Sequence, residues 1–256
     1  MPPGKRRRAP TNPIEAANRK TDEDFIRDHL PPRSATPTYK KEAKIPRSSA
    51  EWTSWTHPTT DKPYTLELRS AGRLSDDELR ACYDLVEHTS GADYRASAGG
   101  WKPAQKMREM RSPELRYVLV TGAASEGEGD GGTAAAGKIR GFTSLMPTFE
   151  EGEPVVYCYE IHLMEELRGT GMGRKLMDIQ IAVARSIPIV EKVMLTCFVA
   201  NASARAFYDK LGFERDAISP PERKLRFGKV FVPDYVIMSR RVRGGEEEQK
   251  RKKSKS

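Results

Sequence analysis

The chain has 256 residues, of which 37% are apolar, and a net charge of +8. It holds no run near the roughly 18–20 apolar residues of a membrane span, so no membrane association is expected. The three cysteines form no CxxC pair, the histidines form no metal-ligand cluster with them, and no secretory segment opens the chain. We therefore expect no metal, and reduced thiols in an intracellular protein.

The positive charge is concentrated at the two ends. Residues 1–50 hold 12 basic and 6 acidic residues, and residues 240–256 hold 8 and 3. The remainder, residues 51–239, therefore carries a net charge of −3. A mildly acidic body favours a basic substrate, although a charge of this size is a weak indication.

We divide the chain into three parts. Residues 1–50 are expected to form a disordered, basic, Pro-rich arm, residues 51–242 one folded domain, and residues 243–256 a charged disordered tail. The low-complexity segment 123–137 is interpreted as a flexible insertion between two strands. Basic clusters in both tails are typical either of solvated segments or of nuclear import and nucleic-acid contacts; these clusters are Gly4–Arg8 and Lys250–Lys255.

Apolar periodicity predicts alternating strands and helices in the domain. Ser75 followed by Glu78 has the pattern of a capping box at a helix start. The expected strands are Tyr64–Arg69, Leu115–Thr121, Ile139–Met146, Val155–Leu163, Lys192–Phe198 and Val230–Ser239. The expected helices are one from Ser75 through Val86, then Lys106–Arg111, Lys175–Arg185 and Ala202–Leu211. This alternation predicts an α/β fold with a mixed central sheet flanked by helices.

A Gly-rich segment, Arg168–Gly173, lies between a predicted strand and a predicted helix. The first turn of a helix leaves backbone N–H groups unpaired and carries positive potential, so this position favours an anion. The segment reads GxGxG, which fits neither a P-loop nor the GxGxxG dinucleotide fingerprint.

The segment resembles the Arg-x-x-Gly-x-Gly pyrophosphate loop of GNAT acetyltransferases. Asn201–Phe213 resembles a second signature of that family, an Asn followed by a helix that ends Phe-Tyr-x-x-x-Gly-Phe. The resemblance implies the GNAT acyl-CoA N-acyltransferase fold and acetyl-CoA as the cofactor, while Phe207, Leu211 and Phe213 are expected to pack in the core. The cofactor-binding residues implied are Ile161, His162, Leu163, Arg168, Gly169, Thr170, Gly171, Met172, Gly173, Arg174 and Asn201.

Across residues 65–242 the chain is similar to one branch of that family, the NatD N-terminal acetyltransferases. The segments that carry this similarity are Val156–Ile161, Arg168–Gly173, Val193–Thr196, Tyr235 with Ser239–Arg241, and Tyr94 with Gly100–Lys102. NatD enzymes acetylate the α-amino group of histones 4 and 2A, whose tails begin Ser-Gly-Arg-Gly-Lys. The resemblance implies these histone tails as partners, a monomer, and a location in nucleus and cytoplasm.

The resemblance also implies residue roles. Glu160 is expected to be the catalytic base, acting through an ordered water. Tyr208 is expected either to protonate the departing thiolate or to pack in the core. The substrate-binding residues implied are Tyr94, Trp101, Thr148, Glu150, Glu151, Tyr159, Thr196 and Tyr235. Glu150 and Glu151 would pair the substrate's third-position Arg. The chain departs from the family at Thr148, where an acidic residue is expected, and at Gly99, where a second Trp is expected.

Two alternatives stay open. One is a GNAT acetyltransferase that acts on a lysine or a small amine. The other is a chromatin- or nucleic-acid-binding module that uses the basic tails and carries a degenerate GNAT core. The intact Arg168, Gly171, Gly173, Asn201 and Glu160 argue against degeneracy.

Overall fold

A computed structural model describes residues 12–30, 52–122, 137–224, 226 and 230–243. The basic clusters at residues 4–8 and 250–255 and most of the insertion lie outside these residues, so their predicted roles stay predictions. None of the described helices is long and apolar enough to span a membrane. All three cysteines are buried free thiols.

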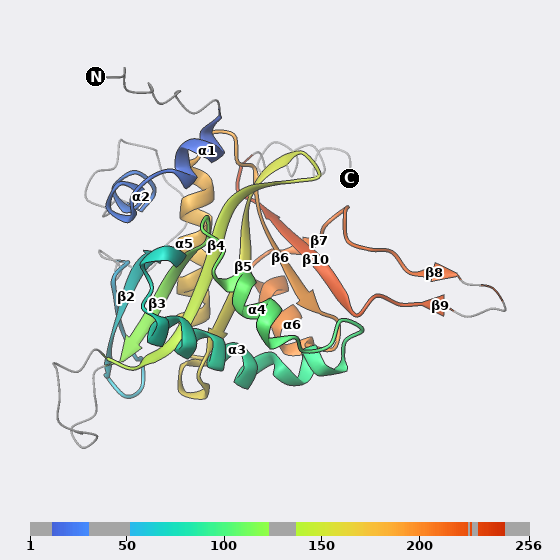
Figure 1. Cartoon of the computed structure of the whole chain (residues 1–256), viewed down its shortest axis with the longest axis horizontal. Coiled ribbons are helices and arrows are strands. Elements are labelled where there is room, and N and C mark those ends of the chain that lie inside the picture. Colours follow the sequence, from blue (N-terminus) through green and yellow to red (C-terminus); the bar gives the residue numbers. More distant parts are fainter. Residues whose placement is uncertain (1–11, 31–51, 123–136, 225, 227–229, 244–256) are drawn as a thin grey trace, which may run out of the picture.

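The described residues form a mixed sheet of eight strands in the order β1-β2-β3-β4-β5-β6-β10-β7 (Figure 1). All neighbours in it are antiparallel except β5 and β6. The strands are β1 (Ser54–Thr56), β2 (Pro63–Ser70), β3 (Arg116–Gly122), β4 (Ile139–Glu150), β5 (Glu153–Leu163), β6 (Lys192–Phe198), β7 (Glu214–Arg215) and β10 (Tyr235–Arg241). A separate hairpin pairs β8 (Arg223–Lys224) with β9 (Val230–Phe231).

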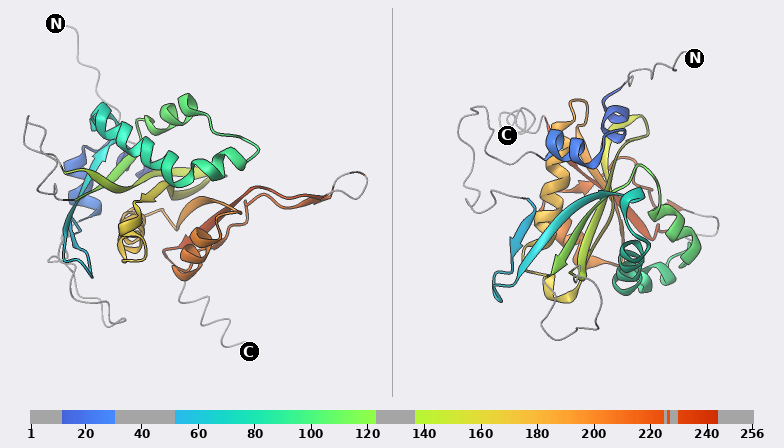
Figure 2. Two further views of the ribbon diagram at one scale, coloured as in Figure 1. Left: turned by 90° about the horizontal axis from the view of Figure 1, so that it is seen from below. Right: turned by 60° about the vertical axis from the view of Figure 1, so that its left-hand side comes forward.

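Helices cover both faces of the sheet. On one face lie α3 (Asp76–Ala96) and α4 (Pro103–Met110), and on the other lie α5 (Met172–Ser186) and α6 (Ala202–Lys210) (Figure 2). Each face has its own apolar core. One includes Tyr117 and Phe142 of the sheet beneath α3 and α4, and the other includes Leu176 on the buried side of α5. The mixed sheet flanked by helices confirms the predicted fold class.

The predicted start of α3 is confirmed in detail. The Ser75 hydroxyl accepts a hydrogen bond from the backbone N–H of Glu78, and the Glu78 carboxylate accepts one from the N–H of Ser75. This reciprocal capping box satisfies two N–H groups that the helix itself cannot pair.

The prediction of a disordered arm over residues 1–50 is wrong for residues 12–30. These form α1 (Pro13–Asn18) and α2 (Asp22–His29), which Asn12 and Thr21 cap. Phe25 is fully buried, and Asp22 forms a buried ion pair with Arg116 of β3. Six- and eight-residue helices show too little periodicity to detect in a sequence, and they are stable here because they pack on the sheet. The folded domain therefore includes them.

Two further predictions need correction. The expected strand Val230–Ser239 is divided, because β9 pairs with β8 while β10 pairs with β6 and β7. Arg243, assigned to a disordered tail, donates hydrogen bonds to the carbonyls of Arg185 and Ile187 at the end of α5. A guanidinium there satisfies carbonyl groups that the helix leaves unpaired.

Candidate functional site

The centre of the sheet opens where β5 and β6 separate. Their parallel pairing runs from Val155–Lys192 to Cys158–Leu195 and stops, while both strands continue (Figure 1). Beside this point β5 has a bulge. The consecutive residues Ser144 and Leu145 of β4 pair with Glu160 and Cys158, so Tyr159 between them has no partner on β4. In the described chain, the Ile161–Leu163 backbone is paired with a strand on its β4 side alone. Its other edge is therefore available to an extended ligand.

Glu160 lies at this opening, and both of its carboxylate oxygens are engaged. Oε1 accepts a hydrogen bond from Nζ of Lys106 at 2.9 Å, and Oε2 lies 2.6 Å from Nε2 of His162. Burial raises the pKa of Glu160, but His162 and then Lys106 outweigh it and hold the pKa below its usual value. Glu160 is therefore a carboxylate at neutral pH, as a base must be.

Several aromatic side chains pack on the same face of the sheet as α3 and α4, and Tyr94 among them is close enough to feel the charge of Glu160. Tyr94 packs against Trp101 and Phe198, with ring centroids 5.1 and 5.0 Å apart. Tyr159 packs against Tyr157 at 5.2 Å. Burial and then the Glu160 charge raise the pKa of Tyr94 to about 12, so Tyr94 stays protonated and can donate a hydrogen bond. The structure thus brings Tyr94, Trp101 and Tyr159 to the same region as Glu160.

The Gly-rich segment forms the turn into α5. Gly169 and Gly171 have φ values of 74° and 100°, and no atom lies within 4 Å of where their Cβ atoms would be. The backbone thus exposes an open concave turn beside the unpaired N–H groups of Met172, Gly173 and Arg174, which fits a pyrophosphate. Thr170 bonds the carbonyl of Leu167, and Arg168 bonds that of Leu163.

The second signature lies beside the first. A Cβ on Gly173 would meet the ring of Phe207 at 3.3 Å, so this glycine allows α5 and α6 to approach. Asn201 caps α6 by accepting a hydrogen bond from the N–H of Ala204. Tyr208 is buried against Phe207 and Phe213, and burial raises its pKa well above the usual value. This packing agrees with a core role, whereas the thiolate-protonating role stays a prediction.

The remaining predicted substrate residues lie along β4, β6 and β10. Glu150 is half-buried. Burial is the main cause that raises the pKa of Tyr157 and Tyr159, and the nearby charge of Glu150 raises both further. Glu151 is exposed in the β4–β5 turn with a φ of 47°. The Thr196 hydroxyl bonds that of Tyr157 at 2.6 Å, so Tyr157 joins the predicted set. Thr148 is half-buried on β4, and Tyr235 is exposed at the start of β10.

Sequence reasoning missed two residues of this site. Lys106 lies on the buried side of α4, and Thr89 of α3 contacts Nδ1 of His162 at 2.5 Å. Lys106 shares a helix face with the buried Met110, four residues on, so its place on that apolar face was the available signal.

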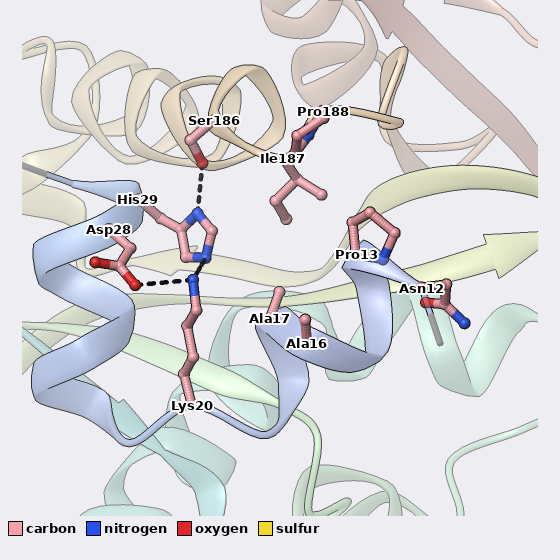
Figure 3. Close-up of a pocket in the computed structure, with 10 residues that line it drawn as sticks. All are labelled: Asn12, Pro13, Ala16, Ala17, Lys20, Asp28, His29, Ser186, Ile187 and Pro188. Atoms are coloured by element: carbon pink, nitrogen blue, oxygen red, sulfur yellow. Dashed lines mark hydrogen bonds and ion pairs between the residues drawn. The ribbon is translucent and has the colours of Figure 1, made fainter. Parts of the chain in front are cut away.

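A cavity of about 560 Å³ lies elsewhere, between α1, α2 and the end of α5 (Figure 3). Within it, His29 bonds Ser186 through Nδ1 at 2.7 Å and Lys20 through Nε2 at 2.9 Å. The Lys20 ammonium can only donate, so Nε2 accepts and Nδ1–H donates to Ser186. Burial and then Lys20 lower the pKa of His29 to about 4. A histidine that donates to the serine cannot activate it, so this group is no Ser–His nucleophile.

A sequence model of the acetyltransferase (GNAT) family matches residues 77–213, more than half of the chain. The chain belongs to this family. The match includes β5, the Gly-rich turn and the Asn201 signature, which are the elements that form the site. GNAT acetyltransferases take their acetyl group from acetyl-CoA, and the open turn before α5 fits its pyrophosphate.

Two curated relatives are similar in sequence. N-alpha-acetyltransferase 40 of Saccharomyces cerevisiae is 34% identical over 168 residues, covering 57% of this chain and 54% of the relative. The 5-NmdU N-acetyltransferase of Pseudomonas phage PaMx11 is 36% identical over 77 residues, covering 30% and 51%. The chain thus spans about half the length of the curated relatives it matches.

Solved structures with related folds are more distant in sequence. Arabidopsis thaliana NAA60 in complex with a bisubstrate analogue is 10% identical with a TM-score of 0.48, covering 69% of this chain and 99% of that one. The ribosomal-protein-S18-alanine N-acetyltransferase of Escherichia coli is 19% identical with a TM-score of 0.43, covering 71% and 97%.

Proposed function

We propose that the protein is an N-terminal acetyltransferase that transfers acetyl from acetyl-CoA to the α-amino group of a protein. The observation that carries this proposal is the buried Glu160 carboxylate among aromatic rings, where β5 leaves β6. Support for the α-amino group comes from the 34% identity to N-alpha-acetyltransferase 40. That similarity carries the proposed substrate, the Ser-Gly-Arg-Gly tails of histones 4 and 2A, and with it a location in nucleus and cytoplasm.

The chemistry suits such a substrate. Near pH 7.2 roughly a fifth of α-amino groups are neutral, against less than about 0.1% of lysine side chains. A weak base therefore suffices, and Glu160, whose pKa is lowered, is a weak base. In this proposal the carboxylate accepts the amine proton through a water. The edge of Ile161–Leu163 that pairs with no described strand orients the thioester arm. Acetyl-CoA supplies the activated acetyl group.

Recognition of the tail is assigned to the opening of the site. Tyr94, Trp101 and Tyr159 form apolar walls that favour a small first residue such as Ser. Glu150 is assigned to the third-position Arg, because a carboxylate pairs a guanidinium through two hydrogen bonds. Burial and then the negative charge of its neighbour Glu151 raise the pKa of Glu150, and the Glu151 charge also attracts a cation.

The experiment is mass spectrometry of a Ser-Gly-Arg-Gly-Lys peptide incubated with the protein and acetyl-CoA. We expect one acetyl group on the α-amino nitrogen and no product from a peptide whose α-amino group is blocked. Acetylation of the lysine at the fifth position of the blocked peptide would instead indicate a lysine acetyltransferase. The absence of product from both peptides would reject the substrate class.

A further inference from the structure

Lys106 is buried beside the candidate base, which is an unusual position for a lysine. Its side chain is 8% exposed, and its ammonium contacts Glu160 at 2.9 Å and Glu109 at 3.0 Å. The same nitrogen lies 4.9 Å from the centre of the Tyr94 ring. Two carboxylates and a ring face can satisfy three N–H donors, which allows a lysine to be buried as a cation.

The second oxygen of Glu160 also faces a donor. Thr89 donates its hydroxyl proton to the Leu85 carbonyl at 2.8 Å, so its oxygen accepts the Nδ1 proton of His162. The other ring nitrogen, Nε2, lies 2.6 Å from Oε2 of Glu160. Both oxygens of Glu160 thus have a polar partner before any substrate arrives.

This arrangement discriminates between the two forms of an incoming amine. An ammonium entering beside Glu160 meets a fixed cation, the Lys106 ammonium, which is already bonded to the same carboxylate and to that of Glu109. Repulsion between like charges in a partly desolvated site disfavours binding of the substrate amine in its charged form. A neutral amine avoids that repulsion and keeps the lone pair that attacks the thioester. Its proton leaves to solvent before binding.

We propose that Lys106 is a positioning residue, an inference that rests on the function proposed above. Its ammonium fixes the Glu160 carboxylate and, by like-charge repulsion, makes the site bind the substrate α-amino group in its neutral form.

The titratable groups that interact electrostatically with the Lys106–Glu160 pair come from several elements. They are Tyr94 of α3, Glu109 of α4, Tyr117 of β3, Cys158 and His162 of β5, and Tyr208 of α6. Burial raises the pKa of the three tyrosines and of Cys158, so these four stay neutral through pH 9. When the Lys106 charge is removed, the groups at the pair that can titrate are therefore the bound amine, His162 and the carboxylates Glu109 and Glu160.

The test measures kcat and kcat/KM from pH 6.5 to 9 with the Ser-Gly-Arg-Gly-Lys peptide. Lys106→Gln keeps a hydrogen-bond donor without the charge, and Lys106→Arg keeps the charge. Arg108→Gln removes an exposed charge from the same helix and is the matched control. Thermal unfolding and acetyl-CoA titration establish that each variant is folded.

In the wild type we expect kcat/KM to rise with the free amine, near pH 7.8, and kcat to stay flat, because only neutral amine binds. In Lys106→Gln the ammonium form of the substrate should bind as well. The plot of kcat against pH then rises with an apparent pKa at or above about 7.8, and KM at pH 6.5 falls below that of the wild type. Lys106→Arg and Arg108→Gln should keep the flat kcat of the wild type.

Two results would overturn the inference alone: a flat kcat in folded Lys106→Gln, or a limb in Lys106→Arg that matches the one in Lys106→Gln. If Lys106→Gln does not fold, the wild type still decides, since a kcat limb near pH 7.8 in the wild type contradicts exclusive binding of neutral amine. A wild type that makes no α-acetylated peptide at any pH rejects the proposed function, and this inference with it.

Discussion

The Lys106 ammonium and the Glu160 carboxylate lie 2.9 Å apart, and each side chain is 8% exposed. Removing two charges from water costs free energy that their attraction only partly returns, so a buried ion pair is a poor source of stability. This pair lies where β5 and β6 separate, at the one parallel pairing among the described strands of the sheet. The pair therefore lies at the place where the proposed chemistry occurs.

The first prediction concerns Glu160 itself. Glu160→Gln keeps the size of the side chain but removes its charge, so turnover should fall by about 10²-fold or more because the base is lost. Acetyl-CoA affinity should change little, because the Gly-rich turn before α5 is a separate element. Steady-state kinetics and titration calorimetry measure the two effects. Glu191→Gln, which alters an exposed carboxylate paired with Arg241, is the control. Near-normal turnover in Glu160→Gln would remove Glu160 from the mechanism.

Local patterns predicted most of the domain. The period-two strands and the capping box at Ser75 depend on neighbouring residues, so they can be read without knowing the fold. The Gly-rich turn before α5 was equally visible, since its residue types are fixed by backbone geometry.

What the sequence could not reveal depends on contacts between distant residues. The helices α1 and α2 are held on the sheet by buried apolar residues such as Phe25, and Asp22 of α2 contacts Arg116, which lies 94 positions further along the chain. Lys106 and Thr89 join the site only because α3 and α4 pack over β5, where they meet Glu160 and His162. A lysine in a short helix ordinarily lies in solvent, so its spacing from Met110 is a weak signal and the tertiary structure is needed to show that this one is buried.

The second prediction tests the Gly-rich turn with two isosteric substitutions. Gly171 has a φ of 100°, a conformation that Asn and Asp tolerate better than other residues do. Gly171→Asp and Gly171→Asn therefore impose similar backbone strain and fill the same open space, but only Asp adds a negative charge. If the turn holds the pyrophosphate, Gly171→Asp should bind coenzyme A about tenfold more weakly than Gly171→Asn, because like charges repel. Calorimetric titration at low salt measures the difference, and equal affinities would contradict the assignment.

The third prediction separates the two acidic residues of the β4–β5 turn. Glu150 is half-buried beside Tyr157 and Tyr159, whereas Glu151 points into solvent. Glu150→Gln should therefore lower kcat/KM for Ser-Gly-Arg-Gly peptides by roughly tenfold or more, the usual effect of losing a hydrogen bond to a charged group. Glu151→Gln should have a much smaller effect. With Ser-Gly-Ala-Gly peptides the Glu150→Gln loss should disappear. The same loss on both peptides would show that Glu150 does not read the Arg.

The fourth prediction concerns pH and the docking of α2. The pKa of His29 is about 4 in the folded protein, against an ordinary value of 6.5. Between these values the unfolded chain binds the proton and the folded chain does not, so stability is fully present above pH 6.5 and falls as the pH drops toward 4. At pH 5 the loss relative to pH 7.5 should be about 1–2 kcal/mol.

Urea unfolding at pH 7.5 and pH 5 measures this loss. His29→Gln lacks the titrating group, so its stability should fall less than that of the wild type over the same interval, even if it starts lower. His88→Gln is the matched control, because His88 is exposed and bonds Glu165 on the surface. The wild type and His88→Gln should therefore lose similar amounts. A fall in His29→Gln as large as in the wild type would show that other groups titrate, and that the contact of His29 with Lys20 and Ser186 survives in acid.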